Sequence, residues 1–542
     1  MDSQHERDEQ ILEILTHKLR TGGLSRRQFI QAAALFGVGG ALAACVPPTA
    51  GQTGAPAVTG AGAPTGTVRF LVAESFWANW HPFLHTAQIQ NRIQRQIFDR
   101  LVEAETADFS KPAPMLATSW RQLDALTWEL KLKEGVKFHG GQEFTAEDAK
   151  ATVELASGAT DVKVNTAARW VPTTGEVVDK LTVRFKTKEP FGPFLLQLTV
   201  TDVVSAADVN KGVEPMKAAP NGTGPFRVVT DEKDRKVMEA FSGYWRGAPR
   251  IKTLTWEFIQ DSQTRLSALL AGQAQVIDRV PPEHFQALKG SPNLVLTSVT
   301  GLENVNLWIR QDRPPFDGNP KLRQALAWSI DREALTKNLV GGASETALSH
   351  LPNRALFAAP QSPKYTLDPE RAKKLLAEAG FASGGPEFIL WGTTGFLPRA
   401  KDVTEAIADN LKKVGMKPTV TITDVAAIID ALFSKDKPGS VFHLSWSGNG
   451  DPHVSLATLY RSPGAWTGAH DSKLDDLIDS GARATKDADR VAVYKEVQAY
   501  LWENMPHVPL YNSDFTIAHV KALSGLRVLP NFNTYFYPAA LA

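Results

Sequence analysis

Alternating apolar and polar residues predict strands at several places beyond residue 67. Trp128, Leu130 and Leu132 alternate with polar neighbours, and shorter stretches at 183–185 and 420–422 repeat the pattern. A period of two places alternate side chains on one face of a strand. These segments are therefore predicted to be half-buried strands.

Two helix starts carry recognisable signals. Thr145 is followed three residues later by Asp148, as in a capping box. Asp368 precedes Pro369, and the apolar residues that follow recur at helical spacing until Gly380. Helices are therefore predicted to begin near residues 145 and 368.

One stretch of the chain alternates strands with helices. It contains strand-like segments at 388–391, 418–423 and 441–446, with helical patterns at 403–411 and 428–432 between them. This order predicts a parallel sheet with right-handed crossovers, and such sheets bind ligands beyond the carboxyl ends of their strands. Trp391 and Trp446 stand at such ends, where they either face a ligand or pack in the core.

Length, charge and cysteine content limit the class of protein. The chain has 542 residues, more than one hydrophobic core usually serves, so two or more cores are expected. Its 59 basic and 58 acidic residues give a net charge of +1, without the strongly basic field of a nucleic-acid binder. The single Cys excludes an intramolecular disulfide and a cysteine-rich zinc site.

Residues 1–44 are predicted to be an export signal. Arg26 and Arg27 stand before an uncharged, mostly small and apolar run from Ala32 to Ala44, which is too short to span a bilayer. Paired arginines before such a run are typical of a twin-arginine signal peptide. The run leads into Cys45 and resembles the lipobox of bacterial lipoproteins, which implies cleavage before Cys45 and lipidation of its thiol; the alternative is a signal peptide with a chance cysteine.

A tether is predicted at 45–66. The stretch 46–67 has no charged or aromatic side chain but four Pro and five Gly. Such a segment buries too little apolar surface to offset the entropy lost on ordering. Residues 1–44 contain equal numbers of basic and acidic residues, so their removal leaves the net charge at +1. The sequence thus predicts a globular body held by a lipid at the outer face of a membrane.

Common catalytic motifs are absent from the sequence. It contains no Gly-x-Ser-x-Gly, His-Glu-x-x-His or Gly-x-x-x-x-Gly-Lys pattern. The glycine-rich segment 222–225 ends in Pro225, which lacks an amide donor, so it is predicted to be a turn into a strand rather than a phosphate loop. This lowers the expectation of an enzyme without excluding one.

Two clusters of polar residues are also expected to be structural. His81 and His85 have the spacing of metal ligands on a helix, but Pro82 lies between them, and no metal is expected there. The carboxylates of Asp475, Asp476 and Asp479 are predicted to form the solvated face of an amphipathic helix.

A series of short segments covers most of the chain beyond the tether. They are 116–120 (LATSW), 127–141 (TWELKLKEGVKFHGG), 144–148 (FTAED), 222–226 (GTGPF), 244–247 (YWRG), 265–272 (RLSALLAG), 321–326 (KLRQAL), 329–332 (SIDR) and 368–380 (DPERAKKLLAEAG). In this order and spacing the chain resembles the family 5 extracellular solute-binding proteins of ABC importers, a group that includes dipeptide, oligopeptide, nickel and opine receptors.

The resemblance implies a two-lobed, three-domain α/β clamp with mixed sheets, which encloses its solute by hinge closure. It implies a first lobe at 67–298 plus 512–542, with a family-specific subdomain near 100–217, and a second lobe at 299–511. The expected partners are a small solute, ABC permease subunits and the membrane. The protein is expected to be a monomer that binds no nucleic acid, no cofactor and no metal, and is not an enzyme.

The resemblance also implies where the solute is held. An early loop at 74–82 ends in a similar x-Pro and offers Phe76, Trp77 and Trp80, whose rigid rings either stack on a ligand or pack in the core. Trp391 and Trp446, at the strand ends, join the predicted set, together with Thr394.

Both charged anchors of the family's dipeptide receptors are displaced in this chain. Where those receptors carry an aspartate for the ligand's amino group, Asn449 stands here, and Asp451 either replaces it or belongs to a turn. Leu397 and Pro398 occupy the place of the carboxylate-binding arginine, and Arg399 follows. Asn449, Asp451 and Arg399 complete the predicted ligand-binding set.

The sequence therefore predicts a lipid-anchored receptor that captures a peptide or peptide-like solute, in the periplasm or at the outer face of the cytoplasmic membrane. An opine, oligosaccharide or glycoside is the alternative solute, because aromatic side chains suit sugars and the charged anchors are weakened. An exported hydrolase and an envelope chaperone or sensor are further alternatives.

Overall fold

The computed structural model describes residues 63–542, apart from 77–78, 85–87, 106–107, 342–343, 383, 435–439, 449–450 and 463–465. The predicted export signal, Cys45, most of the predicted tether, Trp77 and Asn449 lie outside the described residues. The strand β1 (Thr65–Val72) begins two residues before the expected start of the first lobe, because Thr65 already pairs in parallel with Ile251.

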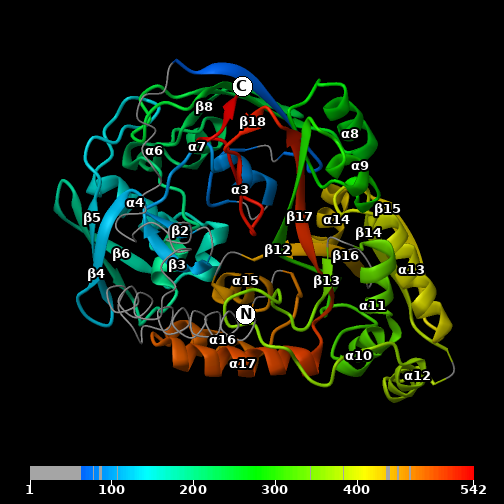
Figure 1. Ribbon diagram of the computed structural model, residues 1–542. Helices are drawn as coiled ribbons and strands as arrows, with labels where there is room; N and C mark the ends of the chain where they lie inside the picture. The colour runs from blue at the N-terminus through cyan, green and yellow to red at the C-terminus, as the bar shows by residue number, and fades with distance from the viewer. Residues whose placement is uncertain are drawn as a thin grey trace, which may run out of the picture. The chain divides into compact units, whose positions relative to one another are not determined.

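A mixed sheet of 11 described strands continues from one lobe into the other (Figure 1). Its order is β15 (Lys417–Thr423), β14 (Glu387–Thr393), β16 (Ser440–Ser447), β12 (Leu294–Ile309), β17 (His507–Val520), β11 (Val276–Asp278), β1, β10 (Ile251–Phe258), β9 (Arg235–Ala240) and β8 (Phe226–Glu232), and β13 (Ser344–Thr346) pairs with β17. As predicted, the glycine-rich segment at 222–225 leads directly into a strand, β8.

The long antiparallel pair β12 and β17 connects the two lobes (Figure 1). The first-lobe core contains Phe515 and Ile517 of β17, whereas the second-lobe core contains Val508 and Tyr511 of the same strand. Between these parts the pairing shifts register at Val299/Glu303. The lobe boundaries expected at 298/299 and 511/512 fall inside this crossing pair.

The parallel unit predicted at 387–446 is confirmed. Strand β14 pairs in parallel with both β15 and β16. The crossover helices are α13 (Ala400–Lys413) and α14 (Val425–Phe433), as the apolar spacing predicts. The other second-lobe helices are α10 (Pro320–Ser329), α11 (Arg332–Ala334), η3 (Leu335–Leu339), α12 (Pro369–Glu378), α15 (Pro452–Leu459), α16 (Ser472–Arg483) and α17 (Asp487–Asn504).

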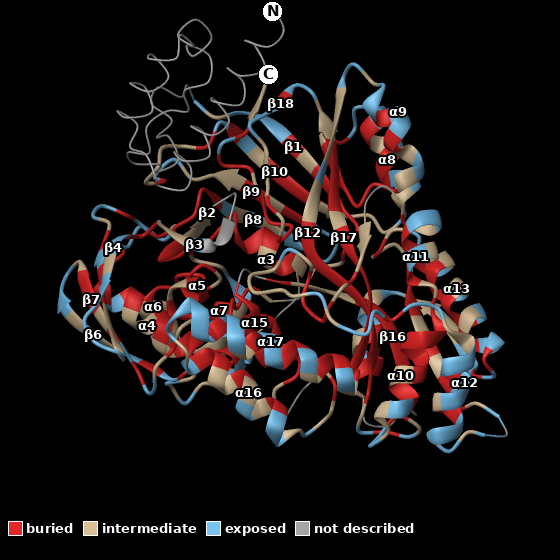
Figure 2. Ribbon diagram, turned by 60° about the horizontal axis from the view of Figure 1, so that its bottom comes forward, coloured by how far each residue is buried: buried red, intermediate tan, exposed pale blue. Residues whose placement is uncertain are grey.

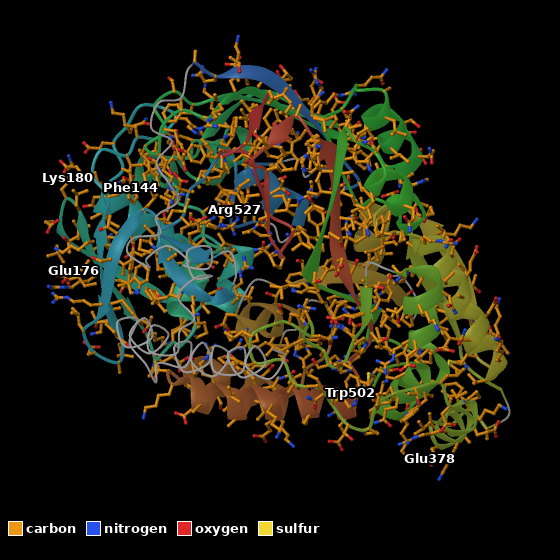
Figure 3. All side chains as sticks on the ribbon, viewed as in Figure 1. Phe144, Glu176, Lys180, Glu378, Trp502 and Arg527 are labelled. Atoms are coloured by element: carbon orange, nitrogen blue, oxygen red, sulfur yellow. The ribbon has the colours of Figure 1, made fainter. Side chains whose placement is uncertain are left out.

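The region near 100–217 contains a separate antiparallel sheet, β4 (Ala117–Gln122), β5 (Thr127–Leu132), β7 (Thr182–Thr187) and β6 (Thr173–Asp179). Helix α4 (Ala146–Ala156) packs on it and begins with the predicted capping box, in which Thr145 N donates to Asp148 Oδ2 at 2.8 Å. In Figure 3 the labelled Phe144, Glu176 and Lys180 of this region lie on the side opposite Glu378 and Trp502 of the second lobe.

Shorter elements complete the first lobe. They are β2 (Val102–Glu105), β3 (Asp108–Pro114), α3 (Gln88–Gln94), η1 (Asn165–Arg169), α5 (Phe194–Leu198), α6 (Ala206–Lys211), α7 (Val213–Ala218), α8 (Ser262–Leu270), η2 (Pro282–His284), α9 (Phe285–Lys289), β18 (Leu523–Ser524), β19 (Arg527–Val528), β20 (Thr534–Tyr535) and β21 (Ala540–Leu541). Figure 2 shows that the sheet strands are mostly buried along their central parts, whereas α12 and α17 present exposed outer faces.

Candidate functional site

A cavity of about 720 Å³ lies where the first lobe, the crossing strands and the second lobe meet. Its lining comes from the loop after β1, from α3 and η1, from β12 and β16, and from α14, α15 and the segment after α15. Most of the lining is apolar, with a few polar groups among it. This size and composition are typical of a small-molecule site, and the position is the one that a clamp between lobes requires.

A buried charged triad stands at one part of the cavity. Arg279 donates to Glu74 at 2.8 Å and to Glu303 at 3.2 Å, and both carboxylates line the cavity. Burial alone would lower the pKa of Arg279, but the two carboxylates raise it well above its ordinary value, so the guanidinium stays charged. Two carboxylates then share one guanidinium, and the triad keeps a surplus negative charge.

Local backbone geometry holds this triad together. Glu74 follows the end of β1, Arg279 follows the end of β11, and Glu303 lies in β12 at the register shift. Arg279 has a positive φ of 48°, and its N–H donates to the carbonyl of Thr516 in β17 at 2.8 Å. A non-glycine residue rarely adopts this conformation, so the surrounding strands must impose it.

Further contacts fix the position of the triad's side chains. The Oγ of Ser445, on the second-lobe strand β16, donates to Glu303 at 2.7 Å. The ring of Phe396 lies 4.7 Å from the Arg279 guanidinium and also lines the cavity. Residues from both lobes therefore converge on the same charges.

Two arginines line other parts of the cavity. Arg461 makes a bidentate ion pair with Asp479, at 2.6 and 2.9 Å, and hydrogen bonding to that carboxylate raises its pKa. Asp475 accepts a hydrogen bond from the N–H of Ser462 at 2.7 Å. The prediction that the carboxylates of this helix form only a solvated face is therefore wrong for Asp475 and Asp479, because both fold back onto the segment that borders the cavity.

Unlike Arg461, Arg169 has no carboxylate within ion-pair distance among the described residues. It ends η1, lines the cavity and is only 9% exposed. Burial lowers the pKa of Arg169 to about 10, although the nearby Asp202 acts in the opposite direction. Asp202 is itself held by Arg100 at 2.8 Å.

Aromatic side chains form one wall of the cavity. Trp446 and Trp466 pack edge to face with ring centres 5.5 Å apart, and Phe433 packs against Trp466 at 5.4 Å. The Trp446 indole N–H donates to the Oγ of Ser455 at 3.1 Å. Its hydrogen-bonding need is thus met within the protein, and the ring remains available as an apolar contact.

The other predicted aromatic residues have structural surroundings. Trp80 is buried in the first-lobe core and donates its indole N–H to Asp231 at 2.7 Å. Phe76 packs against the same core, with the Lys236 ammonium 5.6 Å from its ring centre. Trp391 stacks on Phe442 in the second-lobe core. Of the described aromatic residues in the predicted set, Trp446 is the one that lines the cavity.

The described charged residues of the predicted set are engaged within the protein. Asp451 is buried, caps α15 through the N–H of His453, and pairs with Arg490 at 2.8 Å. Arg399 directly precedes α13 and pairs with Asp402 at 2.8 Å. For Asp451 the structure shows the turn role that the sequence left open beside ligand binding.

The lobes also meet directly at residues outside the cavity lining. Gln260 of the first lobe donates to the Oγ1 of Thr394 in the second at 2.6 Å. The N–H of Gly192 donates to the carbonyl of Ala482 at 2.8 Å. Thr394 therefore serves as a contact between lobes, and the arrangement is that of lobes brought together.

Sequence reasoning missed Arg169, Glu303 and Trp466, and mentioned Glu74 only as part of a loop. Glu74 carried a usable signal, because it follows a buried strand at its carboxyl end. The others are brought to the cavity by tertiary folding, and their local sequence has no distinctive pattern.

Comparisons with known proteins agree with this architecture. The family model "Bacterial extracellular solute-binding proteins, family 5 Middle" matches residues 111–467. The glutathione-binding protein GsiB of Escherichia coli O1:K1 / APEC is 30% identical over 434 residues, which cover 77% of this chain and 84% of that protein. The chain belongs to family 5 of the bacterial extracellular solute-binding proteins.

Solved structures confirm the two-lobed fold. A dipeptide-binding protein from Pseudoalteromonas sp. SM9913, in complex with Met-Leu, matches with a TM-score of 0.81 and 21% identity, over 88% of this chain and 100% of that one. The protein AgaA from A. tumefaciens R10, in complex with agropinic acid, matches with a TM-score of 0.76 and 23% identity, over 88% and 99%. As a family 5 member, the chain is the substrate-binding receptor of an ABC importer.

The described residues show neither a metal-binding cluster nor a membrane-spanning helix. They contain no group of three or more His, Cys, Asp or Glu placed to hold a metal ion. No helix in this part of the chain combines the length and the hydrophobicity needed to cross a bilayer.

Proposed function

We propose that this receptor captures a peptide or peptide-like small solute in the cavity between its lobes and delivers it to membrane permease subunits. The observation that carries the proposal is the cavity itself, which both lobes line and which combines an apolar aromatic wall with separate acidic and basic groups. The identity of 30% to a protein named for binding glutathione, a tripeptide, supports the same class of solute.

Calorimetric titration of the purified chain with glutathione and with short peptides tests this proposal. Saturable binding is expected. In a separate unfolding experiment, ligand at a hundred times its Kd should raise the free energy of unfolding by about 2.7 kcal/mol. Saturable binding of an opine or a sugar, with no response to any peptide, would contradict it.

The aromatic wall favours a second candidate solute. The faces of Trp446, Trp466 and Phe433 suit the ring of an opine, oligosaccharide or glycoside. A solved relative carries agropinic acid, which supports including opines in the same titration. An opine or sugar ligand would require the charged groups of the cavity to be neutralised in another way.

We also propose that the chain acts without catalysis and as a monomer. The relatives named above are binding proteins, which supports a non-enzymatic role. Prolonged incubation with a bound ligand should leave its mass unchanged by mass spectrometry, and any product would point to the hydrolase alternative. Light scattering should give the mass of one chain.

Export and anchoring complete the proposal. Arg26 and Arg27 are proposed to direct twin-arginine export, and Cys45 to carry a lipid. Replacing both arginines by lysine should keep the chain in the cytoplasm of a bacterial host. The Cys45→Ser variant should still be exported but should move from the membrane fraction to the soluble fraction.

A further inference from the structure

Arg169 is a buried guanidinium that makes no direct hydrogen bond or ion pair with a described residue. Among the described residues, no side chain or backbone carbonyl accepts a hydrogen bond or ion pair from it, although it is 9% exposed and faces the cavity. The carboxylate whose charge acts on Arg169 in the described part of the chain, that of Asp202, is already paired with Arg100. An unpaired charge held away from bulk water is costly, so its presence in a cavity wall points to an anionic group of the ligand.

The triad carries a negative charge, opposite to that of Arg169. Arg279 pairs with both Glu74 and Glu303. The second oxygen of Glu74, Oε2, accepts no hydrogen bond from any described residue. The Oε2 of Glu303 receives only a long contact of 3.4 Å from Arg279. These carboxylates therefore have capacity for a further cationic donor.

The two charged places come from different elements of the fold. No ion pair within 4 Å joins Arg169 to Glu74 or Glu303 in the part of the chain that the structure describes, and the three residues come from different elements. The remaining charged lining residue, Arg461, is already neutralised by Asp479. The charges of the described lining residues, together with those of Arg279 and Asp479, therefore sum to zero but are divided between two places. Among these residues, one positive group, Arg169, and one negative charge, on the pair Glu74 and Glu303, have no partner of their own.

We propose that this division selects a zwitterion: Arg169 binds the carboxylate of the peptide-like solute, and Glu74 with Glu303 binds its ammonium group. The inference rests on the proposed function and assigns the charged anchors to residues other than Arg399 and Asp451, both of which are engaged elsewhere. It also accounts for the buried state of all three side chains, since a zwitterionic ligand would satisfy each of them.

Blocked peptides test the assignment. The probes are trialanine, its N-acetyl form and its C-terminal amide, titrated into the purified chain and into the Arg169→Gln variant. Against the unaltered chain, each blocked form should bind about ten- to a hundredfold more weakly than trialanine, because each loses one charge-assisted hydrogen bond. Arg169→Gln should weaken the binding of trialanine by a similar factor. It should leave the already weak binding of the amide unchanged, since the amide has no carboxylate for Arg169 to bind.

Two further variants make the result specific. Glu74→Gln should reduce the preference for trialanine over its N-acetyl form without changing the preference over the amide. Arg121→Gln, at an exposed arginine paired with Glu129, is the matched control and should bind as the unaltered chain does. A melting temperature for each variant identifies any that fail to fold, and Arg169→Lys, which keeps the charge, should retain most of the affinity for trialanine.

The outcomes separate the two proposals. Equal binding of free and blocked trialanine would overturn the zwitterion assignment while leaving a peptide receptor in place. If Arg169→Gln weakened the binding of trialanine and of its amide by the same factor, Arg169 would not bind the ligand's carboxylate. Failure of every form to bind would contradict both the assignment and the peptide-like solute.

Discussion

Gly192 offers a direct way to disturb the contact between the lobes. It stands before α5 in the first lobe, and its N–H donates to Ala482 at the end of α16 in the second. Gly192 is not among the glycines with a positive φ, so its backbone conformation also suits alanine. A Cβ at this position, however, would lie 2.1 Å from the carbonyl oxygen of Ala484, where real Cβ contacts essentially never fall below 3.0 Å.

The Gly192→Ala variant should therefore keep the lobes apart. The two backbones must separate by about 1 Å to admit the methyl group, and such overpacking typically costs about 1–3 kcal/mol. If that cost falls on the arrangement with the lobes together, ligand binding weakens by the same free energy, and the apparent Kd rises about five- to 150-fold. Titration calorimetry measures the affinity, and small-angle scattering with saturating ligand measures the separation.

Gly290→Ala is the matched control. A Cβ there would meet its nearest atom at 3.5 Å, and the residue lies at the end of α9. The reasoning would be refuted if Gly192→Ala bound ligand as tightly as Gly290→Ala and scattered identically with ligand bound. A loss of melting temperature with unchanged affinity would likewise show that the strain is relieved within one lobe.

Three further predictions concern the cavity wall, a buried ion pair and pH. Trp446→Ala should weaken ligand binding by about 2 kcal/mol, and unchanged calorimetric affinity would remove Trp446 from the site. Because the ring also packs against a second-lobe core, the ligand-free melting temperature should fall as well. Asp451→Asn should lower the free energy of unfolding by about 3 kcal/mol, because Arg490 keeps a buried charge without its partner. Its ligand affinity should not change, whereas a selective loss of affinity would restore Asp451 as a ligand contact. Burial lowers the pKa of His443 to about 4, so between pH 6.5 and 4 the unfolded state takes up a proton that the folded state does not. Urea unfolding should therefore show that the free energy of unfolding decreases as the pH is lowered from 6.5 to 4, by about 3 kcal/mol for this residue. His443→Gln should reduce the dependence of the unfolding free energy on pH by one proton.

Much of the fold could be predicted because its signals are local. The strand at 127–132, the capping box at Thr145 and the parallel unit at 387–446 each depend on side chains close together in the sequence. Period-two and period-3.6 patterns report which face of an element is buried, and they do so without knowledge of the partner. The ordered family segments then indicated how these elements are arranged.

The site was less predictable, because its residues meet only through tertiary structure. Glu74, Arg279 and Glu303 are brought together by pairing among β1, β11, β17 and β12. Large aromatic residues, by contrast, were predicted to bind the ligand more often than they line the cavity. A tryptophan near a strand end buries well in either setting. Trp80 joined the first-lobe core, and Trp391 and Trp446 both pack against a second-lobe core, but of these three only Trp446 also lines the cavity.

The triad makes contacts with residues of both lobes. Glu74 and Arg279 belong to the first lobe, whereas Glu303 lies on the crossing strand beside its register shift and accepts a hydrogen bond from Ser445 of the second lobe. Two carboxylates that share one guanidinium repel each other, so drawing them together without a second cation is unfavourable. A ligand ammonium at this place would offset the repulsion most when the lobes are together. The proposed zwitterion would thus bind more tightly to that arrangement than to an open one, and this difference in affinity is what ligand-driven closure requires.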